Sequence, residues 1–174
     1  IELIDNLSSY AQPALLMRNE GPRSGVHTFE DIGDKAGSEF TVARVGRGAA
    51  FGDYDNDGAM DILIAATNSP WTLLHNETAT ENNWLTIRLE GSGSNRSALG
   101  ARVTVYAESN RQMAEVKSGG SYLSQSELRL NFGLGNRAVA DSIRIRWPDG
   151  KFAVLRDVSA NQILTVVEDR GAAR

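Results

Sequence analysis

Apolar and polar residues alternate along much of the chain in short runs, and a period of two predicts β-strands. The alternation is clearest where Ile143, Ile145 and Trp147 are separated by Arg144 and Arg146. No long stretch shows the 3.6-residue period of a helix. The predicted strands cover residues 14–19, 26–31, 48–52, 61–66, 71–75, 84–89, 101–107, 112–117, 127–134, 142–147, 152–155 and 162–167. Short strands with turn residues between them are typical of sandwiches, barrels and propeller blades, so we expect an all-β fold.

The two halves of the chain differ in their strand pattern. The run from Ile62 to Ala66 is apolar on both faces, whereas the strand at 142–147 has one apolar and one polar face. Between the halves, residues 78–83 are polar, and Trp84 opens a new strand. We therefore predict a first domain over residues 1–77, a linker at 78–83, a second, sandwich-like domain over 84–169, and a tail at 170–174.

Four aspartates stand close together between two predicted strands. Asp53, Asp55, Asp57 and Asp61 occupy positions one, three, five and nine of a nine-residue window. Calcium takes six to eight oxygen ligands, and a loop that curls round one point presents alternate side chains inward. Four carboxylates would also repel one another without a cation. The spacing therefore predicts a Ca²⁺ site.

Two further residues of the loop fit this prediction. Gly58, at position six, allows the sharp bend, and the backbone carbonyl of Ala59 would add a fifth oxygen. Position twelve is Ile64 and the flanks read as strands, so the site is not an EF-hand but a strand-loop-strand site. The alternative is an ordinary turn in which Asp, Asn and Gly gather without an ion.

The residues around this loop resemble a known repeat. The segment 47–63, with 15–21, 27–32 and 73–77, is similar to the FG-GAP/VCBS repeat of integrin-like β-propellers, whose strand-loop-strand turns carry calcium. The resemblance covers about residues 10–77. It implies that the first half is a partial β-propeller with calcium in its loop.

The second half resembles a different family. Residues 95–103, 118–125, 132–135 and 145–150 are similar, in the same order, to the ASPIC/UnbV domain, which often follows such repeats in bacterial exported proteins and in animal cartilage acidic proteins. That resemblance implies adhesion, or binding at a matrix or cell surface, with a protein or glycan ligand.

A single repeat is too little for a propeller, which needs at least about four blades. A lone blade exposes sheet edges and an apolar face. We therefore expect residues 1–77 to pack on the second domain, to pair with another copy in a homo-oligomer, or to belong to a longer propeller.

The composition of the chain excludes some classes of partner and favours a cellular location. The net charge of −4 gives no case for binding nucleic acid, and no apolar run is long enough for a membrane-spanning helix. Cysteine is absent, which favours a bacterial protein among exported ones. We expect an extracellular or cell-surface location, with the bacterial periplasm as an option.

The sequence offers little for catalysis. His27 and His75 lie at strand positions and read as packing or surface residues, and Ser121 lacks the Gly-x-Ser-x-Gly elbow of a nucleophile. We expect the protein not to be an enzyme. A role as part of a hydrolase stays open, because two carboxylates from distant segments could form an acid pair.

Aromatic residues of the second half raise a carbohydrate-binding alternative, since flat rings on a sheet can stack on sugars. Trp147 shares parity with core positions and Trp84 opens a strand, so both are predicted to pack in the core. Tyr106, on the polar face, and Tyr122, in a Gly-Ser loop, are the candidate ligand-binding residues. The leading hypothesis is a non-enzymatic, calcium-binding, extracellular adhesion or ligand-binding module, and a carbohydrate-binding module of a secreted polysaccharide-active protein is the alternative.

Overall fold

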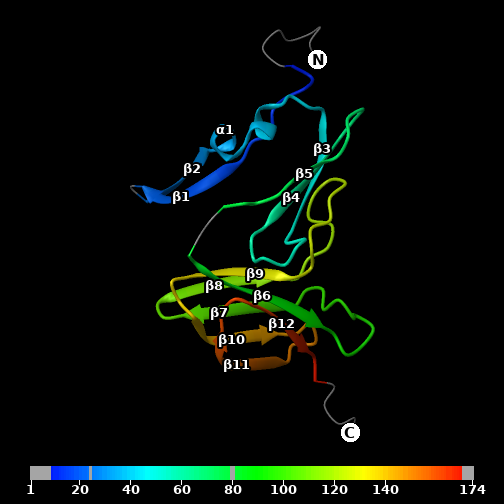
Figure 1. The fold of residues 1–174 in the computed structure, drawn as a ribbon. Coiled ribbons are helices and arrows are strands. Elements are labelled where there is room, and N and C mark those ends of the chain that lie inside the picture. Colours follow the sequence, from blue (N-terminus) through cyan, green and yellow to red (C-terminus); the bar gives the residue numbers. More distant parts are fainter. Residues whose placement is uncertain (1–8, 24, 79–80, 170–174) are drawn as a thin grey trace. The chain divides into compact units, whose positions relative to one another are not determined.

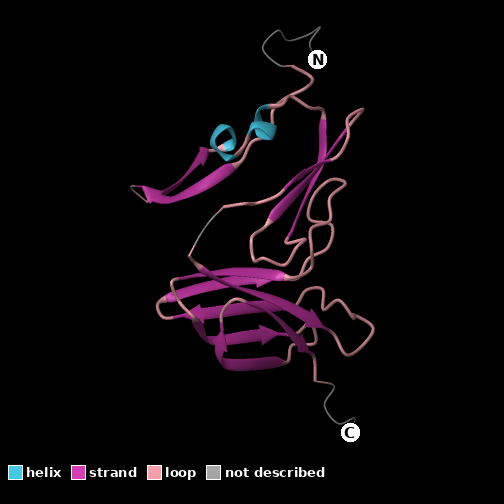
Figure 2. Cartoon of the chain, viewed as in Figure 1, coloured by secondary structure: helices cyan, strands magenta, loops and turns pink. Residues whose placement is uncertain are grey.

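Strands dominate the computed structural model, which describes residues 9–23, 25–78 and 81–169 (Figure 2). The all-β prediction is confirmed. Between the second and third strands lie short helical segments that the sequence analysis does not predict, α1 at Gly33–Ala36 and the 3₁₀ segment η1 at Ser38–Thr41. None of the helices in the described residues is long and apolar enough to cross a membrane.

Twelve strands follow one another in the part of the chain that the structure describes (Figure 1). They are β1 (Met17–Arg23), β2 (Val26–Asp31), β3 (Gly46–Gly52), β4 (Asp61–Ala66), β5 (Thr72–Leu74), β6 (Asn83–Glu90), β7 (Arg102–Ala107), β8 (Asn110–Glu115), β9 (Leu130–Gly135), β10 (Val139–Arg146), β11 (Phe152–Ser159) and β12 (Gln162–Val167). The ranges predicted for β2, β4 and β12 agree at both ends, and the others differ by a few residues.

The chain folds into two compact units. The first comprises Ile1–Ala49 and Ile62–Leu74, and the second comprises Ala50–Asp61 and His75–Arg174. The limits fall within β3, at the start of β4 and at the end of β5, whereas the sequence analysis places a linker at 78–83. The consequence for function is that the whole acidic loop belongs to the second unit, together with the C-terminal strands.

The first unit contains the antiparallel pair β1–β2 and most of a three-stranded sheet in the order β3-β4-β5. Ile62 pairs with Leu74, and Ile64 pairs with Thr72. Apart from Asp61, the residues of β4 are half-buried or exposed despite its apolar sequence. A propeller blade usually has four strands, so the assignment of this sheet to a propeller stays a prediction.

The second unit is built on a two-sheet sandwich. One sheet has the order β11-β10-β7-β8, and the other has the order β12-β6-β9, in which β12 runs parallel to β6 (Figure 1). Alternate residues of both sheets form one hydrophobic core. Its fully buried members include Leu85 and Ile87 of β6, Val103 of β7, and Ile143 and Ile145 of β10. Period-two alternation along these strands therefore decides which side chains face the core.

The two tryptophans predicted for the core behave differently. Trp147 is buried and belongs to the core cluster, as predicted. Trp84 is only half-buried and does not belong to that cluster. Its indole lies instead against the acidic loop, a contact that the strand pattern does not predict.

Candidate metal centre

Asp53 begins the loop between β3 and β4, and the residue is 2% exposed. One carboxylate oxygen accepts a hydrogen bond from the backbone N–H of Asp57 at 3.1 Å, and the other accepts one from Gly58 at 3.0 Å. The carboxylate thus closes the loop on itself. Asn56 and Gly58 adopt positive φ angles, of 65° and 92°, that turn the chain back towards Asp53.

Asp61 ends the loop and is also 2% exposed. Its carboxylate accepts hydrogen bonds from the backbone N–H of Tyr54 at 3.2 Å and of Asn76 at 2.8 Å. Among the described residues, no Arg, Lys or His side chain forms an ion pair with Asp53 or Asp61. Two buried negative charges are therefore held by backbone amides alone.

Three of the predicted ligands come together. Asp53, Asp55 and Asp61 each place a carboxylate oxygen within 4.8 Å of the others. Asp57 is grouped differently, with Asp55 and His75. Its Oδ1 accepts a hydrogen bond from the backbone N–H of Ala59 at 2.8 Å, an Asx turn that shapes the end of the loop.

His75 is a neighbour that the sequence analysis missed. Its Nε2 lies 3.1 Å from Asp55 Oδ2, and its ring packs edge-on against Tyr54, with centroids 5.5 Å apart. His75 follows β5, so the pairing of β5 with β4 brings it back to the loop. Nothing in the spacing of the loop itself indicates a residue twenty positions away.

The loop has a negative potential that is felt at Tyr54. The pKa of the Tyr54 phenol is raised above its ordinary value, first by desolvation and then by the negative charges of Asp55, Asp61 and Asp57. A cation near these carboxylates would be favoured by the same charges.

The segment 126–131, which leads into β9, contacts the loop from one side. The backbone N–H of Glu127 donates to the carbonyl of Phe51 at 2.9 Å. Its Oε1 accepts hydrogen bonds from the Asp53 N–H at 3.3 Å and from the Asn131 amide at 2.7 Å. Glu127 therefore ties the first residue of the loop to the sandwich.

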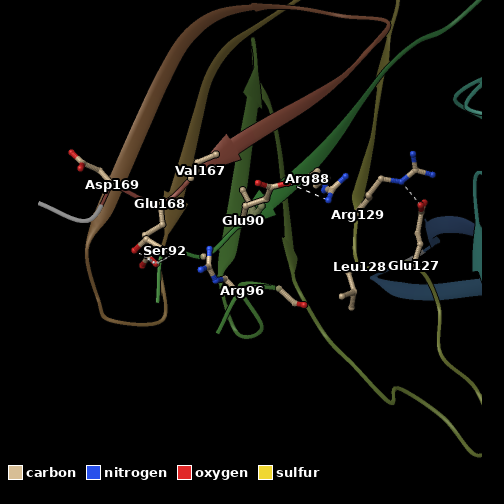
Figure 3. A pocket seen from close by; sticks show the side chains of 13 residues that line it. Arg88, Glu90, Ser92, Arg96, Glu127, Leu128, Arg129, Val167, Glu168 and Asp169 are labelled. Atoms are coloured by element: carbon tan, nitrogen blue, oxygen red, sulfur yellow. Dashed lines mark hydrogen bonds and ion pairs between the residues drawn. The ribbon is translucent and has the colours of Figure 1, made fainter. Parts of the chain in front are cut away.

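Arg129 adds three further contacts on this side. Its guanidinium donates to the Asp53 carbonyl and to the Asn56 side chain, both at 2.5 Å, and pairs with Glu127, as the dashed line in Figure 3 marks. Because Arg129 contacts the backbone of Asp53 and not its carboxylate, it fixes the loop without neutralising the buried charge.

Gly58 meets the sandwich at the indole of Trp84. A Cβ at position 58 would lie 2.2 Å from Trp84 Cε2 and 2.3 Å from Nε1, well inside van der Waals contact. Only glycine fits between the turn and the ring. The acidic loop thus packs between Trp84 on β6 and the segment that leads into β9.

A groove of about 1010 Å³ adjoins this segment (Figure 3). Arg88, Arg96 and Arg129 line it together with Glu90, Glu127 and Glu168. Arg88 pairs with Glu90 at 3.1 Å, and Glu168 accepts hydrogen bonds from Ser92. Since both signs of charge line the groove, it favours neither an anion nor a cation as its ligand.

The two candidate ligand-binding tyrosines lie in separate elements. Tyr106 is half-buried on β7, where its register partners are Ser142 and Arg111. Tyr122 is 71% exposed, in the loop between β8 and β9. The structure therefore does not bring these two residues into the acidic loop.

Comparison with known proteins finds a family match in the C-terminal part of the chain. Residues 91–173 match the ASPIC and UnbV family. The matched segment begins at the end of β6 and includes every strand from β7 to β12. The resemblance of the second half to this family is confirmed, while the resemblance of the first half to FG-GAP/VCBS repeats stays a prediction.

Three animal proteins are similar to this chain. Cartilage acidic protein 1 of Mus musculus, Homo sapiens and Xenopus tropicalis is 32% identical over 127 residues, which cover 71% of this chain and 19% of the relative. The chain thus spans about a fifth of their length. A continuous stretch covering 71% of 174 residues includes residues 53–61, so the similar stretch spans the acidic loop and at least the first part of the ASPIC and UnbV segment.

Proposed function

We propose that this protein is a non-enzymatic, calcium-stabilised ligand-binding module that works outside the cell. The observation that carries the calcium part is the convergence of Asp53, Asp55 and Asp61, two of them buried without a cationic partner among the described residues. Burying a carboxylate is costly unless a positive charge or several hydrogen bonds compensate it. A bound cation would supply the missing charge.

The donor set fits calcium. Asp53, Asp55 and Asp61 offer only oxygen atoms, which hard cations prefer, and Asp57 and the carbonyl of Ala59 would add oxygens from the same loop. The alternative set with His75 contains an imidazole nitrogen, which suits transition metals better. Both residues that are buried belong to the all-oxygen set, and we therefore favour calcium. The ion would have a structural role, because it would bind the folded loop only.

The experiment is a thermal melt with calcium and with excess chelator. At a calcium concentration of about 100 times the Kd, binding to the folded state alone adds about 2.7 kcal/mol, or roughly 5–10 °C for a chain of this size. We expect the rise to disappear in Asp55→Ala, which removes a ligand that is exposed and shared by both metal groups. Asp57→Ala should reduce it less.

Asp141→Ala is the matched control, because Asp141 is an exposed aspartate of β10 outside the loop. Its calcium response should equal that of the unsubstituted protein. If calcium does not raise the melting temperature of the unsubstituted protein, the loop is an ordinary turn and the calcium part of the proposal is wrong.

The binding role rests on the ASPIC and UnbV segment and on the similarity to cartilage acidic protein 1. We infer a module that presents a surface for a protein or glycan, with the loop as a fixed part of its framework. The absence of enzymatic activity, the location outside the cell, and association with another copy or with further propeller blades belong to this proposal. A screen of the calcium-loaded protein against immobilised extracellular ligands tests it.

A further inference from the structure

The outward face of the four-stranded sheet gathers positive charge. On β11, β10, β7 and β8, every second residue faces away from the core. The register of the four strands aligns these outward residues in three rows. The rows are Phe152–Arg146–Arg102–Glu115, Val154–Arg144–Thr104–Met113 and Arg156–Ser142–Tyr106–Arg111. Five arginines and one glutamate occupy the grid, in a chain whose net charge is −4. We call these twelve residues the arginine face.

The side chains of this face point away from the core. All five arginines are exposed, while their strand neighbours Val103, Ile143 and Ile145 are buried at 0% exposure. Two contacts across strands agree with this orientation. Arg102 donates to Glu115 at 2.6 Å, and the guanidinium of Arg144 lies 4.3 Å above the ring of Phe152.

Most of these arginines are not neutralised. Within the described ranges, Arg111, Arg144, Arg146 and Arg156 form no ion pair, and only Arg102 is paired with an acid of the face. The stacking of Arg144 on Phe152 leaves the in-plane N–H donors of the guanidinium free. Guanidinium groups bind sulfate and carboxylate through two parallel hydrogen bonds.

The spacing of the arginines suits an extended anionic chain. Neighbouring strands lie about 4.8 Å apart and alternate residues of a strand about 6.6 Å apart, so the four strands give a face roughly 14 Å wide. Arg146 pairs in register with Arg102, and Arg144 lies one row away on the same strand. A narrow polymer with repeated anionic groups can contact several of them at once.

Uncharged members of the face narrow the choice of polymer. Tyr106 lies among the arginines, and Phe152, Val154 and Met113 are more than half exposed. Aromatic and aliphatic side chains can pack against the apolar faces of sugar rings, whereas contacts to a duplex nucleic acid are dominated by its phosphates. We propose that the arginine face binds an acidic polysaccharide, with Arg144 and Arg146 at its centre. This inference rests on the proposed role as a binding module, but not on calcium.

The test measures binding of the full chain to immobilised heparin as the sulfated probe, at low and at physiological salt. We expect salt-dependent binding that weakens about tenfold for each arginine removed, and so by about a hundredfold in Arg144→Gln/Arg146→Gln. The matched control is Arg88→Gln/Arg96→Gln, which removes the same charge from exposed residues outside the face. It should bind heparin as the unsubstituted protein does. Thermal melts of both double variants verify that they fold.

Other anionic ligands test whether the face prefers a polysaccharide to other polyanions. Equal or tighter binding to polyglutamate, to duplex DNA or to vesicles containing phosphatidylserine would overturn the assignment to polysaccharide. Equal weakening in the two double variants, or no heparin binding at low salt, would overturn the arginine face as a site. A calcium-dependent melt in a protein that fails to bind heparin would leave the calcium module standing and remove only this inference.

Discussion

The acidic loop and the arginine face carry opposite charges, and the fold holds those charges in different ways. In the loop, Asp53 and Asp61 are buried, and each accepts two backbone N–H bonds. On the face, Arg144 and Arg146 are exposed on a sheet whose other side is the core. The charges of the loop are therefore part of how the chain folds, whereas Arg144 and Arg146 are exposed and form no ion pair within the described residues.

This difference has an energetic consequence. A buried charge that loses a partner costs several kcal/mol, while an exposed charge contributes about 0–1 kcal/mol to stability whether paired or not. Substitutions that disturb the loop should therefore lower stability strongly. Substitutions on the arginine face should change binding and leave stability nearly untouched.

The largest loss of stability is expected for Gly58→Ala, which disturbs the contact between the acidic loop and Trp84. The new Cβ would overlap the indole, and alanine would be held at a φ of 92°. We expect a loss of about 2–4 kcal/mol in the free energy of unfolding, measured by urea denaturation in chelator. Gly93→Ala is the control, since a Cβ at position 93 meets no atom within 4 Å. Similar stabilities of Gly58→Ala and Gly93→Ala would show that the loop does not pack tightly against Trp84.

A smaller loss is expected for Arg129→Gln. The guanidinium donates to the Asp53 carbonyl and to Asn56, and its removal leaves both without this donor. Hydrogen bonds from charged donors contribute about 1.5–3 kcal/mol, so the free energy of unfolding in chelator should fall by about 2 kcal/mol. Arg88→Gln, which breaks an exposed pair with Glu90, should cost less than about 1 kcal/mol. If both variants lost the same stability, Arg129 would be an ordinary surface residue.

The smallest effect concerns the ion pair between Arg102 and Glu115 on the arginine face. Arg102, by hydrogen bonding first and by its charge second, lowers the pKa of Glu115 below its ordinary value. A lowered folded-state pKa contributes stability above the unfolded pKa, and that contribution is lost as the pH falls through the folded value. In Arg102→Gln the pKa of Glu115, followed by NMR titration, should rise towards its ordinary value. An unchanged pKa would mean that the two side chains do not pair in solution.

The sequence predicts the arginine face and the acidic loop to different extents. Alternation along 142–147 identifies the core position of Ile143 and the outward position of Arg144, because the period of a strand is local information. The apolar run at 61–66 likewise predicts the strand that the structure shows there. What a single strand does not contain is its partner. The grid that places Arg146 beside Arg102 needs the pairing of β10 with β7.

In the acidic loop, the spacing of the aspartates predicts the candidate ligands but not the residues that pack against them. Asp53, Asp55 and Asp61 converge as the Ca²⁺ prediction requires, yet Asp57 is grouped with His75 instead. His75, Arg129 and Trp84 reach the loop through strands that are distant in sequence. A turn motif records the residues that bend the chain, whereas the residues that pack on it depend on the tertiary fold.

Calorimetric titration of calcium into chelator-treated protein tests the central claim most directly. We predict one calcium ion bound per chain, with binding abolished in Asp55→Ala and retained in Asp141→Ala. Absence of binding heat in the unsubstituted protein at millimolar calcium, or equal binding by all three proteins, would contradict the account of the acidic loop as a calcium site.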